Sequence, residues 1–399
     1  MRDNRYSGFL KSFAPTFIRL LLLSATLVLI AANGASAAEE MNRAGYTSST
    51  ICSYCHADIY KSWEKSAHAR AYTNRTFQES SRQAYMVSKV LAKNFCVKCH
   101  APTAVYGPAL DLDVNLPVTR EGVGCDFCHT IEKVDLADVH VPYKADVGGQ
   151  KNASMRLLGP KPNPSGANPA AHQAAYAAWF NKSELCGGCH EMANANGLKV
   201  GETYTEWKSS KYSAEGVQCQ GCHMHATPGT PYESSVKKPA KTTIPNHSLS
   251  PEASRLQGAV DLKLVSAAPL EKGAYQVDVA MTNVKAGHNI PTGSPVRTLA
   301  LEVTLQGDGM SRVVQVKTFG KRIIDKNGNW LVNDTDAQIN GTKLKFNTSL
   351  RPMERREVRF VFANVPAGKV KVTARAFLTR NPVVDTDEHV LIPLGEAAK

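Results

Sequence analysis

Ten cysteines and five of the twelve histidines of this chain fall in one short pattern that recurs five times. In each copy two cysteines stand three positions apart, and a histidine follows the second one. At this spacing two thiols can each add to a vinyl group of one haem, and the histidine is placed under the iron. The pattern therefore predicts five covalently bound haems of the c type. The copies are Cys52, Cys55 and His56; Cys96, Cys99 and His100; Cys125, Cys128 and His129; Cys186, Cys189 and His190; and Cys219, Cys222 and His223.

Two other uses of closely spaced cysteines fit this pattern less well. A zinc site would pair such units without placing a histidine after each one, and a disulfide framework would space its cysteines less regularly. The segment from Cys52 to His223 is also short for one large core, so it needs a cofactor to be stable. We therefore expect close-packed haems with short helices between them, and a largely unfolded chain without haem.

The second axial ligand of each iron has to come from the other seven histidines or from a sulfur atom. His68 shares a helical segment with Trp63, and His172 opens an alanine-rich stretch before the fourth motif. His247 follows a segment rich in lysine and proline, which could wrap over a haem, and His288 lies in a turn framed by glycine and proline. We expect these four histidines to be distal ligands. The identity of the distal ligand matters because it sets the potential of the haem and the access of other molecules to its iron.

The remaining candidates are harder to separate. His140 is the preferred fifth distal ligand, but His225 remains an alternative to it. Met192 and Met224 are alternatives with weaker claims, and His389 is expected on the surface.

The N-terminal residues predict export. A basic start is followed by an apolar run over 20–32 and by the small residues Ala35, Ser36 and Ala37, as in a cleaved signal peptide. The apolar run is shorter than the roughly 20 residues that span a bilayer. We expect residues 1–37 to be removed, no membrane span in the mature chain, and a location in the periplasm or at the cell surface.

The basic balance does not by itself indicate nucleic-acid binding. The formal net charge is +12, and the predicted signal segment contributes +3, which leaves +9 for the mature chain. Five haems would add about ten propionate charges, which would nearly cancel that excess. The sequence also has no basic run and no nucleic-acid-binding module.

The chain changes character after about residue 257. Cysteine disappears, and alternating segments over 275–281, 299–305, 312–318, 356–362 and 369–377 are separated by turn residues. This pattern predicts an antiparallel β-sandwich of immunoglobulin-like type. The expected fold class is therefore α+β and multidomain. It comprises a signal peptide (1–37), a mostly helical five-haem domain (38–256) and a β-sandwich domain (257–399) without a catalytic constellation.

Several segments together resemble the periplasmic multihaem cytochromes c of the superfamily that contains hydroxylamine oxidoreductase, its tetrahaem electron acceptor and cytochrome c nitrite reductase. They are the first motif followed by Trp63 and Ser66-Ala67-His68, the run from Gly122 to His129, and the run from Tyr204 to Met224. The resemblance implies distal roles for His68, His172 and His247. It also implies that the loop from Gly287 to Gly293 is similar to a histidine-bearing loop on β-domains attached to such cytochromes.

Two departures from the enzymes of that superfamily favour an electron carrier. Every motif here ends in histidine, whereas nitrite reductases of this type use a lysine at the active haem, and no tyrosine cross-link of the hydroxylamine oxidoreductase kind can be mapped. We expect a carrier in anaerobic respiration that links a quinol-dependent donor or a partner cytochrome to a terminal acceptor. The alternatives are a redox enzyme with one open haem for a small nitrogen or sulfur compound, and a self-associating subunit of an extracellular cytochrome polymer.

Overall fold

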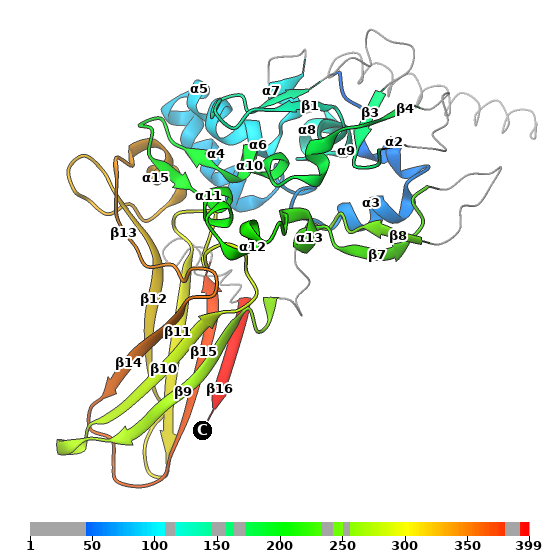
Figure 1. Ribbon diagram of the computed structural model, residues 1–399. Helices are drawn as coiled ribbons and strands as arrows, with labels where there is room; N and C mark the ends of the chain where they lie inside the picture. The colour runs from blue at the N-terminus through cyan, green and yellow to red at the C-terminus, as the bar shows by residue number, and fades with distance from the viewer. Residues whose placement is uncertain are drawn as a thin grey trace, which may run out of the picture.

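The computed structural model describes residues 45–107, 116–145, 156–162, 172–232, 242–249, 256–379 and 392–398. The predicted signal peptide and His389 lie outside these ranges. Short helices and two-stranded sheets make up the upper part of the molecule, and long strands make up the lower part (Figure 1). Among the described residues, no helix has the length and apolar character needed to cross a membrane.

Most helices have one or two turns, and the longest is α4. Asn74 begins α4 by accepting a hydrogen bond from the backbone N–H of Phe77, as N-cap residues do. The helices are α2 (Ser49–Ser53), α3 (Ala57–Trp63), α4 (Arg75–Val87), α5 (Lys89–Leu91), the π-helix η1 (Ala92–Val97), α6 (Lys98–His100), α7 (Thr103–Tyr106), α8 (Pro117–Arg120), α9 (Cys125–His129), η3 (Ala178–Asn181), α10 (Glu184–His190), α11 (Thr203–Lys208), α12 (Lys211–Ala214), α13 (Cys219–His223), η4 (Glu271–Gly273) and α15 (Asp334–Asn340).

The strands fall into two groups. Small pairs decorate the helical part: β1 (Ile131–Val134) with β2 (Tyr143–Ala145), β3 (Arg156–Gly159) with β4 (Gln173–Tyr176), β5 (Met192–Ala193) with β6 (Lys199–Gly201), and β7 (Ala226–Gly229) with β8 (Thr242–Pro245). The long strands are β9 (Val260–Pro269), β10 (Tyr275–Asn283), β11 (Thr298–Gly307), β12 (Val313–Ile324), β13 (Lys343–Asn347), β14 (Arg355–Phe362), β15 (Val370–Thr379) and β16 (Ile392–Ala398).

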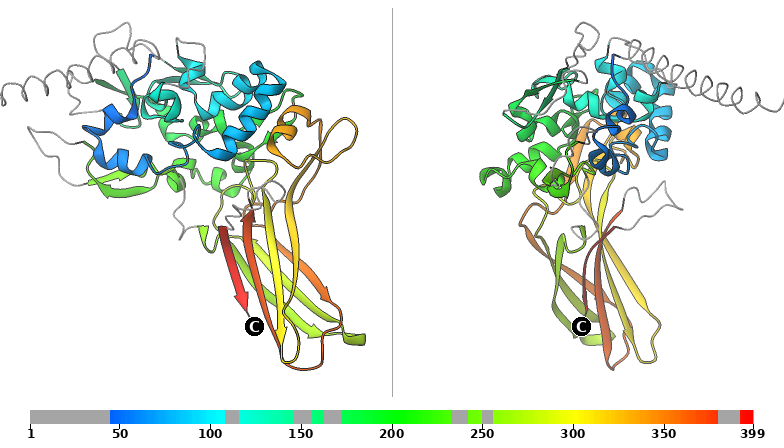
Figure 2. Two further views of the ribbon diagram at one scale, coloured as in Figure 1. Left: turned by 180° about the vertical axis from the view of Figure 1, so that it is seen from behind. Right: turned by 90° about the vertical axis from the view of Figure 1, so that its right-hand side faces the viewer.

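The long strands form two antiparallel sheets that face one another (Figure 2). One has the order β14-β10-β9 and the other β13-β12-β11-β15-β16. Their facing side chains make the largest apolar cluster of the described chain, which includes Val277 and Met281 of β10, Leu301 of β11 and Phe360 of β14. Burial of each such side chain contributes about 1.5–3 kcal/mol. The chain thus combines helices with antiparallel sheets, as the sequence predicts.

The two parts touch through polar and apolar contacts. The Asn194 side chain donates hydrogen bonds of 3.1 and 2.8 Å to the carbonyl oxygens of Ala337 and Gly341. Val200, Ile323 and Ala337 form a small buried cluster beside them. These contacts hold one end of the sheets against the helical part.

Candidate haem sites

The five cysteine motifs define sites 1 to 5, numbered in chain order. Site 1 lies where α2 meets α3, site 2 spans η1 and α6, and sites 3, 4 and 5 lie on α9, α10 and α13. Residues three and four positions apart share one face of a helix. At sites 3, 4 and 5, where one α-helix contains the whole motif, the two thiols and the histidine therefore lie on the same side.

All five sites open into one cavity of about 1840 Å³. At least one cysteine and the histidine of every motif line it. A pocket for a single drug-sized ligand has a volume of about 300–1000 Å³, so this cavity is large enough for several ligands of that size. The apolar clusters of the helical part are small by comparison, the larger one being formed by Tyr46, Leu116, Val118, Phe127, Ile131 and Tyr143.

Four of the five motif histidines are held by contacts of their Nδ1 atoms. His56 Nδ1 lies 2.6 Å from the carbonyl oxygen of Pro231, and His129 Nδ1 lies 2.6 Å from that of Leu158. His100 and His223 make the same contact, at 2.8 Å with Ala71 and 3.2 Å with Leu249. A carbonyl oxygen only accepts, so Nδ1 carries the proton and Nε2 keeps its lone pair for a metal.

Burial keeps the rings of His68, His129 and His190 neutral. Burial, with a smaller contribution from nearby histidines, lowers the pKa of His190 to about 3 and that of His129 to about 4. Burial also lowers the pKa of His68 to about 4. Each ring is therefore uncharged near neutral pH, which is the form that binds iron.

Three motif histidines face a second histidine across the cavity. The ring centroids are 6.2 Å apart for His56 and His172, 6.2 Å for His68 and His190, and 6.4 Å for His223 and His288. Two metal–nitrogen bonds of about 2 Å each, plus the half-widths of two imidazole rings, require a separation of about 6 Å. Sites 1, 4 and 5 therefore have the spacing of two axial ligands on one iron.

Residues 51–130 match the family model described as cytochrome c554 and c-prime. A penta-heme cytochrome c552 from Thermochromatium tepidum superimposes with a TM-score of 0.64 at 21% identity, covering 90% of this chain and 100% of that one. The chain has the fold of a multihaem cytochrome c. The family match indicates haem c as the cofactor, and the cysteine pairs, neutral histidines and shared cavity fit it.

Other comparisons add nothing to this assignment. Spo0M from Bacillus subtilis covers 35% of this chain and 46% of its own at 14% identity. A PapD-like domain of human CEP192 covers 42% of this chain and 92% of its own at 11% identity. Both have a TM-score of 0.14 and carry no argument. No curated protein matches the sequence.

In this cytochrome fold, His247 lies near site 3. Its backbone N–H donates to Ser62 Oγ of α3 at 2.7 Å, just after strand β8 ends, and its Nδ1 lies 2.8 Å from the carbonyl oxygen of Pro245. His247 is one of three histidines, with His56 and His172, that contribute to the lowered pKa of His129. The rings of His129 and His247 both line the cavity.

Sites 2 and 3 of the cytochrome differ from the other three, because a phenyl ring lies beside the motif histidine: at site 3 the Phe180 ring is 5.2 Å from that of His129. Within the described ranges, no histidine ring stacks with or faces His100. The phenyl ring of Phe77 instead lies parallel to it, with centroids 4.0 Å apart. Met192 and Met224 line the same cavity, but neither His140 nor His225 does.

His140, which the sequence suggests as a distal ligand, lies exposed on the outer side of site 2. Lys98 Nζ donates to the carbonyl oxygen of Val139 at 2.7 Å, and Asp138 accepts from the His140 N–H at 3.0 Å. These contacts hold the His140 loop at the surface beside Phe95. We therefore leave His140 out of the ligand set proposed below.

The thiols of different sites pair with one another. Cys52 is hydrogen-bonded to Cys125, which joins site 1 to site 3, and Cys99 is hydrogen-bonded to Cys189, which joins site 2 to site 4. Cys186 is hydrogen-bonded to Cys219, which joins site 4 to site 5. The Cys189 thiol also contributes to the raised pKa of the Cys128 thiol, so sites 3 and 4 are neighbours. Site 4 thus borders sites 2, 3 and 5.

Proposed function

We propose that this chain is an exported carrier that passes electrons between a redox donor and a terminal acceptor through five covalently attached haems. The carrying observation is that all five sites open into one cavity and that cysteines of different sites lie close enough to shift one another's pKa. Bound haems supply centres that gain and lose single electrons. The chain fixes their order, holds their axial ligands and keeps water from the space between them.

The proposed ligand set follows from the ring positions. His56, His100, His129, His190 and His223 would be the proximal ligands. The distal ligands would be His172 at site 1, His247 at site 3, His68 at site 4 and His288 at site 5, supported by the ring separations and by the surroundings of His129. The donor would be a quinol-linked enzyme or another cytochrome in the periplasm. The β-sandwich would complete site 5 as a separate domain after residue 256.

Electron paramagnetic resonance of the ferric protein, together with the mass of the exported chain, tests this proposal. We expect a mass increase of five haems and at least four low-spin centres. A chain with fewer attached haems, or with mostly high-spin iron, would contradict the carrier reading.

Site 2 supports a second candidate function, a redox enzyme with one open iron for a small nitrogen or sulfur compound. It is favoured by the absence of a facing histidine among the described residues and by Phe77 on His100. Carbon monoxide added to the reduced protein should then shift the absorbance of about one haem in five. A reduced spectrum that carbon monoxide leaves unchanged would rule this candidate out.

A further inference from the structure

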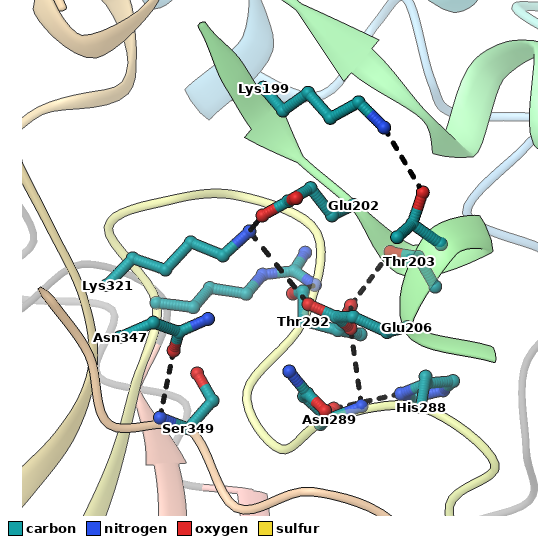
Figure 3. A network of polar contacts seen from close by, with 12 residues as sticks. Lys199, Glu202, Thr203, Glu206, His288, Asn289, Thr292, Lys321, Asn347 and Ser349 are labelled. Atoms are coloured by element: carbon teal, nitrogen blue, oxygen red, sulfur yellow. Dashed lines mark hydrogen bonds and ion pairs between the residues drawn. The ribbon is translucent and has the colours of Figure 1, made fainter. Parts of the chain in front are cut away.

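Three charged side chains meet where helix α11 and the residue before it contact strand β12 (Figure 3). Lys321 Nζ of β12 lies 2.9 Å from Glu202 Oε2 and 3.9 Å from Glu206 Oε1 of α11. The side chains of Lys321 and Glu206 are only 5% and 7% exposed. Burial of charges is costly, so a buried ion pair adds little stability over an apolar contact, and its value more often lies in fixing one arrangement.

The carboxylate of Glu206 also holds the loop that carries His288. Its Oε2 accepts a hydrogen bond of 2.5 Å from Thr292 Oγ1 and one of 3.2 Å from the backbone N–H of Asn289. Thr203, in the first turn of α11, contacts the same Thr292 hydroxyl at 2.8 Å. Helix α11 therefore binds this loop at two points, one before Ile290 and one after Pro291.

These bonds lie directly next to the His288 ring. His288 Nδ1 lies 2.9 Å from the carbonyl oxygen of Asn289, the residue whose N–H Glu206 binds. On the other side of the loop, Asn283 donates to the carbonyl oxygen of His288 at 3.0 Å. A shift of Asn289 would therefore move the His288 ring relative to His223, whose centroid is 6.4 Å away.

We propose that Glu206, oriented by Lys321, is a positioning residue that holds His288 in the axial position of site 5. The inference rests on the proposed role of His288 as a ligand. In this proposal the buried charges serve to place the His288 ring. Glu206 binds the loop that carries His288, and Lys321 binds the carboxylates of Glu202 and Glu206. The charge pair thereby couples the strand part of the molecule to the iron environment of site 5.

Three variants test the proposal in the full, haem-loaded protein. His288→Ala gives the reference spectrum of site 5 without its distal ligand, with one haem in five becoming high-spin. Glu206→Gln weakens the hold on Asn289 and Thr292, so the same high-spin signal should appear at about tenfold or more its wild-type level. Glu215→Gln removes an exposed carboxylate that pairs only with Lys211 among the described contacts, and it should leave the spectrum unchanged.

The outcomes separate the two levels of the argument. If His288→Ala leaves all low-spin signals in place, the ligand assignment fails whatever Glu206 does. If His288→Ala produces the signal but Glu206→Gln matches the wild type, the positioning role is overturned. Should Glu206→Gln lose attached haem, Thr292→Val keeps the charges of Glu206 and Lys321 and removes the contacts of the Thr292 hydroxyl with Glu206 and Thr203, while the hydrogen bond from Asn289 to Glu206 remains. This variant should give a smaller increase in the same signal, and an unchanged spectrum from it would also overturn the proposal.

Discussion

A histidine binds iron through a ring nitrogen that carries no proton, and backbone carbonyls set this state from the far side of the ring. The contact between Nδ1 and a carbonyl oxygen occurs at motif histidines such as His56 and His129 and at two other histidines that line the cavity, His247 and His288. Such outer contacts fix both the tautomer and the orientation of a ligand. Backbone that is itself held in turns and short strands therefore orients these histidine rings.

His172→Ala tests the facing pairs at this scale. The variant removes the ring opposite His56, while the thioether cysteines and the proximal histidine remain. We therefore expect one haem in five to become high-spin with all five haems still attached, as measured by paramagnetic resonance and mass. His140→Ala is the matched control, because this exposed ring does not line the cavity. A fully low-spin His172→Ala protein would show that another residue ligates site 1.

Asp126 gives a prediction about pH. It lies between the cysteines of site 3, is only 5% exposed, and its Oδ1 has no hydrogen-bond partner in the described part of the chain. Burial raises its pKa to about 6 from 3.8, against the opposing effect of hydrogen bonds from Thr47. The unfolded chain therefore releases this proton first, so stability falls as pH rises from about 4 to 6 and is constant above.

The Asp126→Asn variant should not show this fall in stability with rising pH, because asparagine does not ionise. The free energy of unfolding in urea is measured for each protein at pH 4 and above pH 6. Over this range the wild type should lose up to about 3 kcal/mol more than the variant. Asp308→Asn, at an exposed turn, controls for the loss of one negative charge. Parallel pH curves for wild type and Asp126→Asn would mean that the carboxyl group is not desolvated in the folded protein.

The residues that the sequence could identify act within one short motif, whereas those that it could not identify act on residues far away in the chain. The proximal ligands follow from spacing within five residues, which local chemistry fixes. The pairing of His68 with His190 spans more than a hundred residues and depends on how the helices fold around the cavity. No local signal identified Phe77 beside His100, or Glu206 and Lys321 beside the His288 loop, because their roles arise only from tertiary contacts.

At the scale of elements, the turn before α9 positions His68. Gly122 has a φ of +68°, and a Cβ there would lie 2.5 Å from the carbonyl oxygen of His68. The N–H of Val123 donates to that same oxygen at 3.0 Å, and the Trp63 indole donates to Val123. The turn can therefore lie against the His68 segment only because residue 122 has no side chain.

Gly122→Ala should combine backbone strain with a clash. The left-handed conformation costs about 1–2 kcal/mol for alanine, and the clash would push His68 away from His190. Gly197→Ala is the control, because Gly197 has a φ of +75° but a Cβ there would meet nothing within 4 Å. We expect both variants to lose thermal stability, but only Gly122→Ala to gain a high-spin signal. Equal spectra would show that the close approach does not control His68.

The long strands were more predictable than the short elements. The alternating segments 275–281, 299–305 and 356–362 lie within β10, β11 and β14, and the segments 312–318 and 369–377 overlap β12 and β15. Alternation was visible because strands such as β10, β11, β14 and β15 turn one face to the shared core. The edge strand β13 has no buried residue in its pattern, so alternation could not reveal it. The two-residue strand β5 is too short to have a sequence period at all.

The molecule as a whole has two parts that are stabilised in different ways. The sheets enclose an extensive apolar cluster of buried side chains, whereas the helical part encloses the large cavity between small clusters. Side chains that surround an unfilled cavity lose contacts and stability. The helical part should therefore depend on its cofactors, and the sheets should not.

Limited proteolysis of the full chain produced without haem attachment tests this difference. Without haem the helical part has too little apolar contact to offset the entropy of its short elements, so a protease should degrade it first. The sheets bury their side chains against each other, so a fragment beginning near residue 256 should survive, with a β-type circular dichroism spectrum. The haem-loaded protein digested in parallel should resist cleavage in both parts. Cleavage of both parts of the haem-free chain at one rate would contradict this prediction. It would mean that the sheets are stable only when the helical part is filled with haem and holds them through contacts such as those of Lys321 and Asn194.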